Sequence, residues 1–183
     1  TKGYYNAQAG TIGKLLLQAR RLCEAGSGYV TIHASYAGVW DMHADQNNLN
    51  MRDGMEAVGY SFDHAVAAFI EDCEARGLSD KIMLVCCGEM GRTPKLNERG
   101  GRDHWARLAP LMIYGGGIDA GRVIGKSDRL GGEPITDAYN PRHLISSILR
   151  TVIDPGQLRL IPNAPKEVTE LLDHPPIAGL GIG

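Results

Sequence analysis

The pattern of apolar and polar positions changes most sharply at Gly88. The run 81–87, Lys-Ile-Met-Leu-Val-Cys-Cys, is apolar after its first residue and ends at that glycine. A short apolar run bounded by glycine is typical of a strand buried on both faces, as in a parallel sheet. Because ligands of such sheets bind beyond the carboxyl ends of the strands, we expect functional residues in the polar loop that follows.

Two segments repeat apolar residues at three- and four-residue steps, which predicts amphipathic helices over residues 12–23 and 55–76. A glycine follows each segment, as is common just past the end of a helix. Between the helices, the β-branched run 29–33 predicts a strand. Strand, helix and strand in this order form a βαβ unit, so we expect the strands 29–33 and 81–87 to be parallel. Their two loops then leave the sheet at the same edge.

The remaining pattern predicts a third buried strand at 108–114 and a short edge strand at 121–125. Asn140 and Pro141 are typical of a helix start, and apolar spacing continues that helix to Val152. From Gln157 onwards we expect at most one short helix, at 166–172.

These elements predict an α/β fold with a largely parallel central sheet. Residues 1–156 form its main part, and residues 157–183 form a Pro-rich tail of the same domain.

Composition and charge narrow the classes of partner. The chain has 183 residues, of which 43% are hydrophobic and 22% charged, enough for one globular domain. A net charge of -2 gives no global field for nucleic acid, so we expect no nucleic-acid partner. No apolar stretch approaches the roughly 18 residues of a transmembrane helix, so we predict no membrane span.

Candidate metal ligands lie on the predicted loops. Asp41 and His43 form an Asp-x-His pair, Asp103 and His104 an adjacent pair, and Glu89 follows the strand 81–87. Carboxylate oxygens and imidazole nitrogens together suit Zn, Mn, Fe or Ca, and such a set with an open position is what a metal-assisted hydrolase needs. The alternative is that each pair only forms local hydrogen bonds in a turn.

Basic residues crowd the loop after the strand 81–87: Arg92, Lys95, Arg99 and Arg102. Guanidinium groups bind phosphate and sulfate through two parallel hydrogen bonds, so this loop is a candidate anion site. The alternative is a solvated basic loop that pairs with Glu98 and Asp103. No nucleophile lies in a specific sequence setting. If a covalent step exists, we expect its residue outside this chain.

Three motifs occur in order: WDMH at residues 40–43, GEMGRTP at 88–94 and GRDHW at 101–105. With these motifs the sequence resembles the sulfatase-like family 1501 of domains of unknown function, in the alkaline phosphatase and sulfatase superfamily. The resemblance covers nearly the whole chain. It implies a three-layer alkaline-phosphatase-like α/β fold and a metal-dependent hydrolase of sulfate or phosphate esters.

The resemblance also implies roles for single residues. Asp41 and His43 look like ligands of one metal, His104 like its later His ligand, and Glu89 takes the place of a carboxylate ligand. Met90 stands where the superfamily usually has a His ligand, so a second metal site lacks that ligand. The superfamily's nucleophile comes from an N-terminal strand and helix, so we expect this chain to be the C-terminal half of such a domain. Full-length members usually begin with an export signal, which implies an exported protein.

The resulting hypothesis is a metal-dependent hydrolase that uses a divalent ion, Zn, Mn or Ca, on an anionic ester of a small molecule or glycan. Its metal ligands are Asp41, His43, Glu89 and His104. Its ester-binding residues are Arg92, Thr93 and Arg102, and its catalytic residues are Arg92 and Asp103, with Asp103 orienting His104. Two alternatives remain open: a non-catalytic exported protein that binds a sulfated or phosphorylated ligand, and a purely structural domain.

Overall fold

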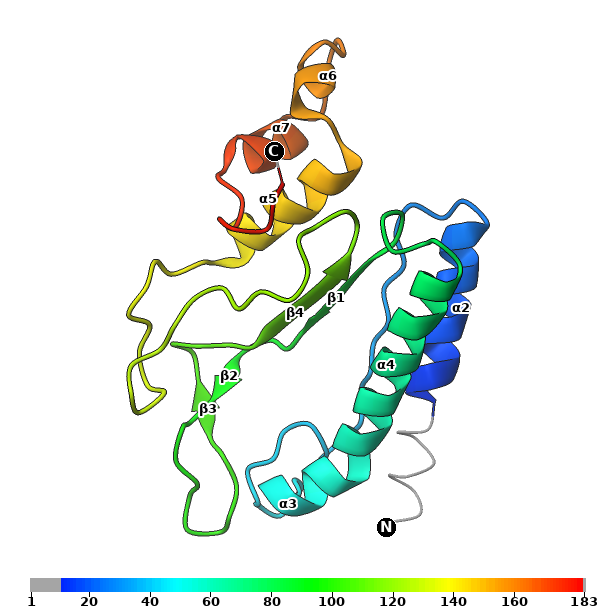
Figure 1. Cartoon of the computed structure of the whole chain (residues 1–183). Coiled ribbons are helices and arrows are strands. Elements are labelled where there is room, and N and C mark those ends of the chain that lie inside the picture. The colour runs from blue at the N-terminus through cyan, green and yellow to red at the C-terminus, as the bar shows by residue number, and fades with distance from the viewer. Residues whose placement is uncertain (1–10, 183) are drawn as a thin grey trace.

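The computed structural model describes residues 11–182. Two helical groups flank a small pair of strands (Figure 1). The first group comprises α2 (Ile12–Glu24), α3 (Met51–Gly54), the π-helical turn η1 (Met55–Gly59) and α4 (Tyr60–Ala75). The strands are β1 (Met83–Cys87), β2 (Gly91–Arg92), β3 (His104–Trp105) and β4 (Leu111–Gly115). The second group comprises α5 (Pro141–Val152), α6 (Pro155–Arg159) and α7 (Lys166–Asp173).

Helices α2 and α4 pack side by side and carry the main core (Figure 1). Their apolar positions face each other, which confirms the two helices predicted from the spacing. The buried core residues are Ile12, Leu16, Tyr36, Val39, Met42, Val58, Val66, Phe69, Cys73 and Ile82. Gly26 has φ +98° and Gly77 has φ +62°, a conformation that glycine adopts without steric cost, so both helices end where the sequence places a glycine.

Strands β1 and β4 are antiparallel, and Met83 pairs with Gly115 while Cys87 pairs with Leu111. Alternate residues of both strands contact the core cluster: Leu84, Cys86, Met112 and Tyr114. Across residues 11–182, strand pairing is limited to this pair, to β2–β3 and to one isolated bridge between Ser127 and Pro134.

The prediction of a three-layer fold with a largely parallel central sheet is therefore wrong. The run 29–33 is not a strand, and neither is 121–125, within the part of the chain described. Residues 29–33 supply Ile32 to the core without joining a ladder. An apolar run reports burial but carries no information on strand direction. Strand β4 returns beside β1 after the loop that follows β1, and an antiparallel return needs no crossover helix.

The C-terminal residues form a second packed group. Helix α5 begins as predicted: the Asn140 side chain accepts hydrogen bonds from the backbone N–H groups of Arg142 and His143, and Pro141 is its first residue. Helix α7 confirms the short helix expected at 166–172. A second helix, α6, was not predicted; it begins at Pro155, before the region from Gln157 onwards in which at most one helix was expected, and ends within that region. The missed helix is α6, whose start carries the same signal, because the Asp154 side chain caps it ahead of Pro155.

The predicted tail packs against α5 at several positions. Leu172, Ile177 and Leu180 are buried. Ser146 donates a hydrogen bond of 2.6 Å to the carbonyl of His174, and the N–H of Ile177 donates to Ser147 Oγ at 2.8 Å. No helix within residues 11–182 is long and apolar enough to cross a membrane, which agrees with the sequence-based expectation.

Candidate metal and anion site

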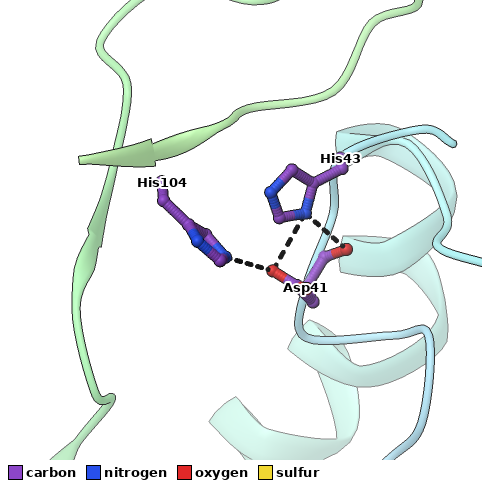
Figure 2. Close-up of side chains that lie close together, drawn as sticks. All are labelled: Asp41, His43 and His104. Atoms are coloured by element: carbon purple, nitrogen blue, oxygen red, sulfur yellow. Dashed lines mark hydrogen bonds and ion pairs between the residues drawn. The ribbon is translucent and has the colours of Figure 1, made fainter.

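Two segments far apart in the sequence meet at this site. Asp41 and His43 lie in the loop between α2 and α3, and His104 lies on β3 (Figure 2). The first loop is closed on itself, because the N–H of Leu49 donates to the carbonyl of Gly38 and the N–H of Ala44 donates to the carbonyl of Leu49. This closure fixes the backbone that carries Asp41 and His43.

Asp41 is the centre of the cluster. Its Oδ1 lies 3.0 Å from His43 Nδ1 and 3.0 Å from His104 Nε2. The two imidazole rings lie 4.5 Å apart, centroid to centroid, and meet edge to face. One ligand atom from each of the three residues lies within 4.8 Å of the other two. These three residues are therefore candidate ligands of a single metal ion.

Arg92 contacts the same carboxylate. Its Nη1 lies 2.5 Å from Asp41 Oδ1, and its Nη2 lies 3.6 Å from Glu89 Oε1. The β2–β3 pairing places Arg92 opposite His104, which brings both side chains to Asp41 from one short hairpin. Burial acts to raise the pKa of Asp41, but the hydrogen bonds from His104 and Arg92 and the charge of Arg92 outweigh it, so that pKa lies below its usual value.

The structure does not bring every candidate residue into this cluster. Glu89 is 71% exposed and contacts Arg92, outside the Asp41, His43 and His104 group. The carboxylate of Asp103 accepts a hydrogen bond from Asn97 at 3.1 Å. Within residues 11–182 no hydrogen bond joins this carboxylate to His104, the residue that Asp103 was expected to orient.

Thr93 and Arg102 are engaged in hydrogen bonds that shape the loop between β2 and β3. Arg102 Nη1 donates to the carbonyl of Thr93 at 2.6 Å, and Thr93 Oγ1 accepts from the N–H of Asp103 at 3.1 Å. The backbone N–H of Arg102 also donates to the carbonyl of Met42 at 2.8 Å. Both residues thus hold the loop in shape, and Arg92 is the basic residue that reaches Asp41.

Sequence reasoning missed two residues that join the loops. The Asn97 side chain donates to the carbonyl of His43 at 2.9 Å. Gly101 lies against the same peptide, because a β-carbon there would be 2.3 Å from His43 C and O. Asparagine in a polar loop and adjacent glycines are both known signals of tight turns, and they were available in the sequence.

Residues 1–164 match the model of a family described as a protein of unknown function (DUF1501). The chain belongs to this family. The resemblance to this family found from the WDMH, GEMGRTP and GRDHW motifs is thereby confirmed. No curated protein and no solved structure matches the chain. The description of the family names no activity, so any function has to be argued from the site.

Proposed function

We propose that this chain supplies a divalent-metal site to a hydrolase of sulfate or phosphate esters. The observation that carries the proposal is the group of Asp41, His43 and His104, whose donor atoms lie within 4.8 Å of one another with Arg92 beside them. Two imidazoles and one carboxylate leave room for a water or substrate oxygen, as in catalytic zinc sites.

The donor set narrows the choice of metal. Imidazole nitrogen suits Zn, a carboxylate such as that of Asp41 also suits Mn, and Ca prefers oxygen ligands throughout. With two of three donors from His43 and His104, we propose Zn or Mn and drop Ca. A bound divalent ion at such a site polarises an ester oxygen and lowers the pKa of an attacking water. Glu89 lies outside the group, so we propose three protein ligands in place of four.

Arg92 is the residue we assign to the anionic ester. Its side chain is 21% exposed and lies between Asp41 and Glu89. A guanidinium group carries five N–H donors, so Arg92 can keep its contact with Asp41 and still offer a pair of donors to a sulfate or phosphate oxygen. We assign Arg102 to the loop rather than to the ester, because its Nη1 is held by the carbonyl of Thr93.

A relation to sulfatases and alkaline phosphatases is part of the same proposal. It rests on the three motifs and on the donor set, and it concerns the chemistry of the site rather than the arrangement of the sheet. Export of the protein is likewise proposed from the motif resemblance alone.

A second candidate is a non-catalytic protein that binds a sulfated or phosphorylated ligand. The contact of 2.5 Å between Arg92 and Asp41 favours it, because Arg92 balances the charge of Asp41 without a further cation. In that case His43, His104 and Arg92 form a hydrogen-bonded platform around one carboxylate, and anions bind to the outer donors of Arg92.

Metal content separates these candidates. The purified chain would be dialysed against Zn²⁺ or Mn²⁺ and measured by elemental mass spectrometry, as wild type and as the double variant His43→Ala with His104→Ala. The control is His33→Ala with His64→Ala, two exposed histidines outside the cluster. We expect bound metal in the wild type and the control and its loss in the site variant. Equal metal in all three proteins rules out this site.

A positive result would be followed by a test of whether the protein hydrolyses aryl sulfates and aryl phosphates, with the Arg92→Met variant alongside. We expect the loss of Arg92 to weaken the binding of the anionic substrate. Metal binding without hydrolysis of either ester class would favour the non-catalytic candidate.

A further inference from the structure

The side chain of Asn97 uses all four of its hydrogen-bonding positions. Its Oδ1 accepts from the N–H of Arg99 at 3.1 Å and of Gly101 at 2.9 Å. Its Nδ2 donates to the carbonyl of His43 at 2.9 Å and to Asp103 Oδ1 at 3.1 Å. An amide group offers two acceptor and two donor positions, so none is left over. The partners also fix its orientation: two N–H donors lie on the oxygen side and two oxygen acceptors on the nitrogen side.

These bonds connect the two segments that form the cluster. The bond to His43 spans 54 positions of the chain. The bond to Asp103 ends one residue before His104 on β3. Asn97 therefore lies between the backbone that carries one imidazole and the backbone that carries the other.

The loop around Asn97 contacts the peptides on both sides of His43. The N–H of Arg102 donates to the carbonyl of Met42 at 2.8 Å, and Gly101 packs within van der Waals range of the carbonyl of His43. Asn97 in turn holds this loop closed, because its own N–H donates to the carbonyl of Gly101 at 2.8 Å. His43 is thus held from the side by the same loop that leads into β3.

We infer that Asn97 is a positioning residue that sets the relative placement of His43 and His104. This inference rests on the proposed function only in taking the Asp41, His43 and His104 group as the site. Asp45 provides the contrast within the neighbouring loop: its carboxylate bonds only to Asn47 and Asn48, two and three positions away, and so shapes a single loop. Asn97 joins two.

The substitution Asn97→Asp tests this inference because a carboxylate has the shape of the amide but replaces its two N–H donors with an acceptor oxygen. Both partners of Nδ2 are oxygen acceptors, the carbonyl of His43 and the carboxylate of Asp103. A carboxylate in place of the amide repels both and loses the link. The matched control is Asn47→Asp, the same chemical change at an exposed residue whose contact with Asp45 is made by its backbone N–H.

The first measurement uses the metal-free chain. Imidazole ¹⁵N chemical shifts at fixed pH and the nuclear Overhauser contact between the rings of His43 and His104 report their placement. In Asn97→Asp we expect both to change for this pair, while the signals of His143 and His174 stay at wild-type positions. In Asn47→Asp we expect no change in the signals of any of these four histidines. A folded Asn97→Asp protein with wild-type signals for His43 and His104 overturns the inference.

The second measurement is Co²⁺ affinity and the visible absorption of the bound ion. Loss of a group that orients a ligand typically weakens metal binding about 10- to 100-fold, and we expect a loss of that size in Asn97→Asp and none in Asn47→Asp. If wild type binds no Co²⁺, the proposed function fails, while the NMR comparison still decides the role of Asn97. If Asn97→Asp does not fold, Asn97→Ser, which retains a shorter donor and acceptor, is compared by the same signals.

Discussion

Arg92 Nη1 lies 2.5 Å from Asp41 Oδ1, the same oxygen that His43 Nδ1 and His104 Nε2 approach at 3.0 Å. One carboxylate oxygen therefore holds together a loop next to α3 and the β2–β3 pair, in which each strand has two residues. The guanidinium of Arg92 is permanently charged and balances the Asp41 carboxylate, which therefore stays ionised. A metal ion or an anionic ligand would have to compete for the side chains of Asp41, Arg92 and the two histidines.

The first prediction concerns Arg92→Met. Without the guanidinium group, the pKa of Asp41 rises, because the effect of burial remains while a large part of the opposing effect is lost. The measurement is a titration of the Asp41 carboxyl ¹³C signal by NMR in chelator-treated protein. The control is Arg107→Met, which removes a pair with Glu133 at 3.5 Å on an exposed surface. An unchanged Asp41 titration in Arg92→Met would contradict the geometry.

The second prediction concerns Gly101→Ala. The new β-carbon would lie 2.3 Å from His43 C and O and 2.7 Å from the carbonyl of Met42, so backbone has to move. We expect a loss of about 1–3 kcal/mol in the free energy of unfolding, the usual cost of overpacking. We also expect weaker metal binding. Urea unfolding measures the first effect and Co²⁺ titration the second.

Gly28→Ala is the control for this substitution. No atom lies within 4 Å of a β-carbon at residue 28, and its φ is not positive. Its effect on stability should stay within about 0.5 kcal/mol. Equal effects of the two substitutions would show that the approach of Gly101 to His43 is not a constraint.

The third prediction compares two arginines that share Asp72. Arg20 Nε lies 2.5 Å from Asp72 Oδ2 and its Nη1 pairs with Glu24, while Arg76 Nε lies 2.7 Å from Asp72 Oδ1. Arg20 is 4% exposed and Arg76 50%. Arg20→Met should lower the free energy of unfolding by about 2 kcal/mol, because the ion pair of a buried guanidinium with Asp72 and its hydrogen bond to Glu24 are lost. Arg76→Met should lower it by less, because the Arg76 side chain is exposed and solvent screens its ion pair. Chemical denaturation of both variants under one condition makes the comparison.

The helices of this chain could be predicted from its sequence because their signals are local. The spacing of Ile12 and Leu16, the glycine at residue 26 and the Asn140-Pro141 start each act within one or two turns. The same local logic covers α6, which was missed although Asp154 precedes Pro155 in the same way. The partner of a strand is not set by local sequence. The run 81–87 was therefore predicted correctly as a strand, but its expected parallel neighbour 29–33 was wrong, because β1 pairs with β4.

The candidate site shows the same division. Asp41, His43 and His104 were recognisable in the sequence as candidate ligands. In the structure, one ligand atom from each of them lies within 4.8 Å of the other two. The expected reason, a shared edge of a parallel sheet, is wrong; the β2–β3 hairpin and the loop around Asn97 bring them together instead. Glu89 follows β1 as predicted, but its side chain contacts Arg92, because direction beyond a strand end is set by the turn and not by sequence spacing.

The last prediction concerns pH and the packing of α5 on the segment after α7. The rings of His143 and His174 lie 4.4 Å apart, centroid to centroid, and the ring of Tyr139 lies 5.3 Å from that of His143. His174 Nε2 is buried and has no hydrogen-bond partner among the described residues. Burial, then the nearby His143 and Arg142, lower the pKa of His174 from its usual value of 6.5.

A histidine whose pKa is lower in the folded state than in the unfolded state favours folding only while it is neutral. Its contribution is complete above pH 6.5 and is lost as the pH falls through the lowered pKa, because the unfolded chain binds the proton first. The melting temperature of wild type should therefore fall between pH 7.5 and pH 5 by more than that of His174→Gln. His33→Gln, at an exposed histidine, should follow wild type. If His174→Gln shows the full wild-type loss at pH 5, protonation of His174 does not weaken the contact between α5 and the C-terminal segment.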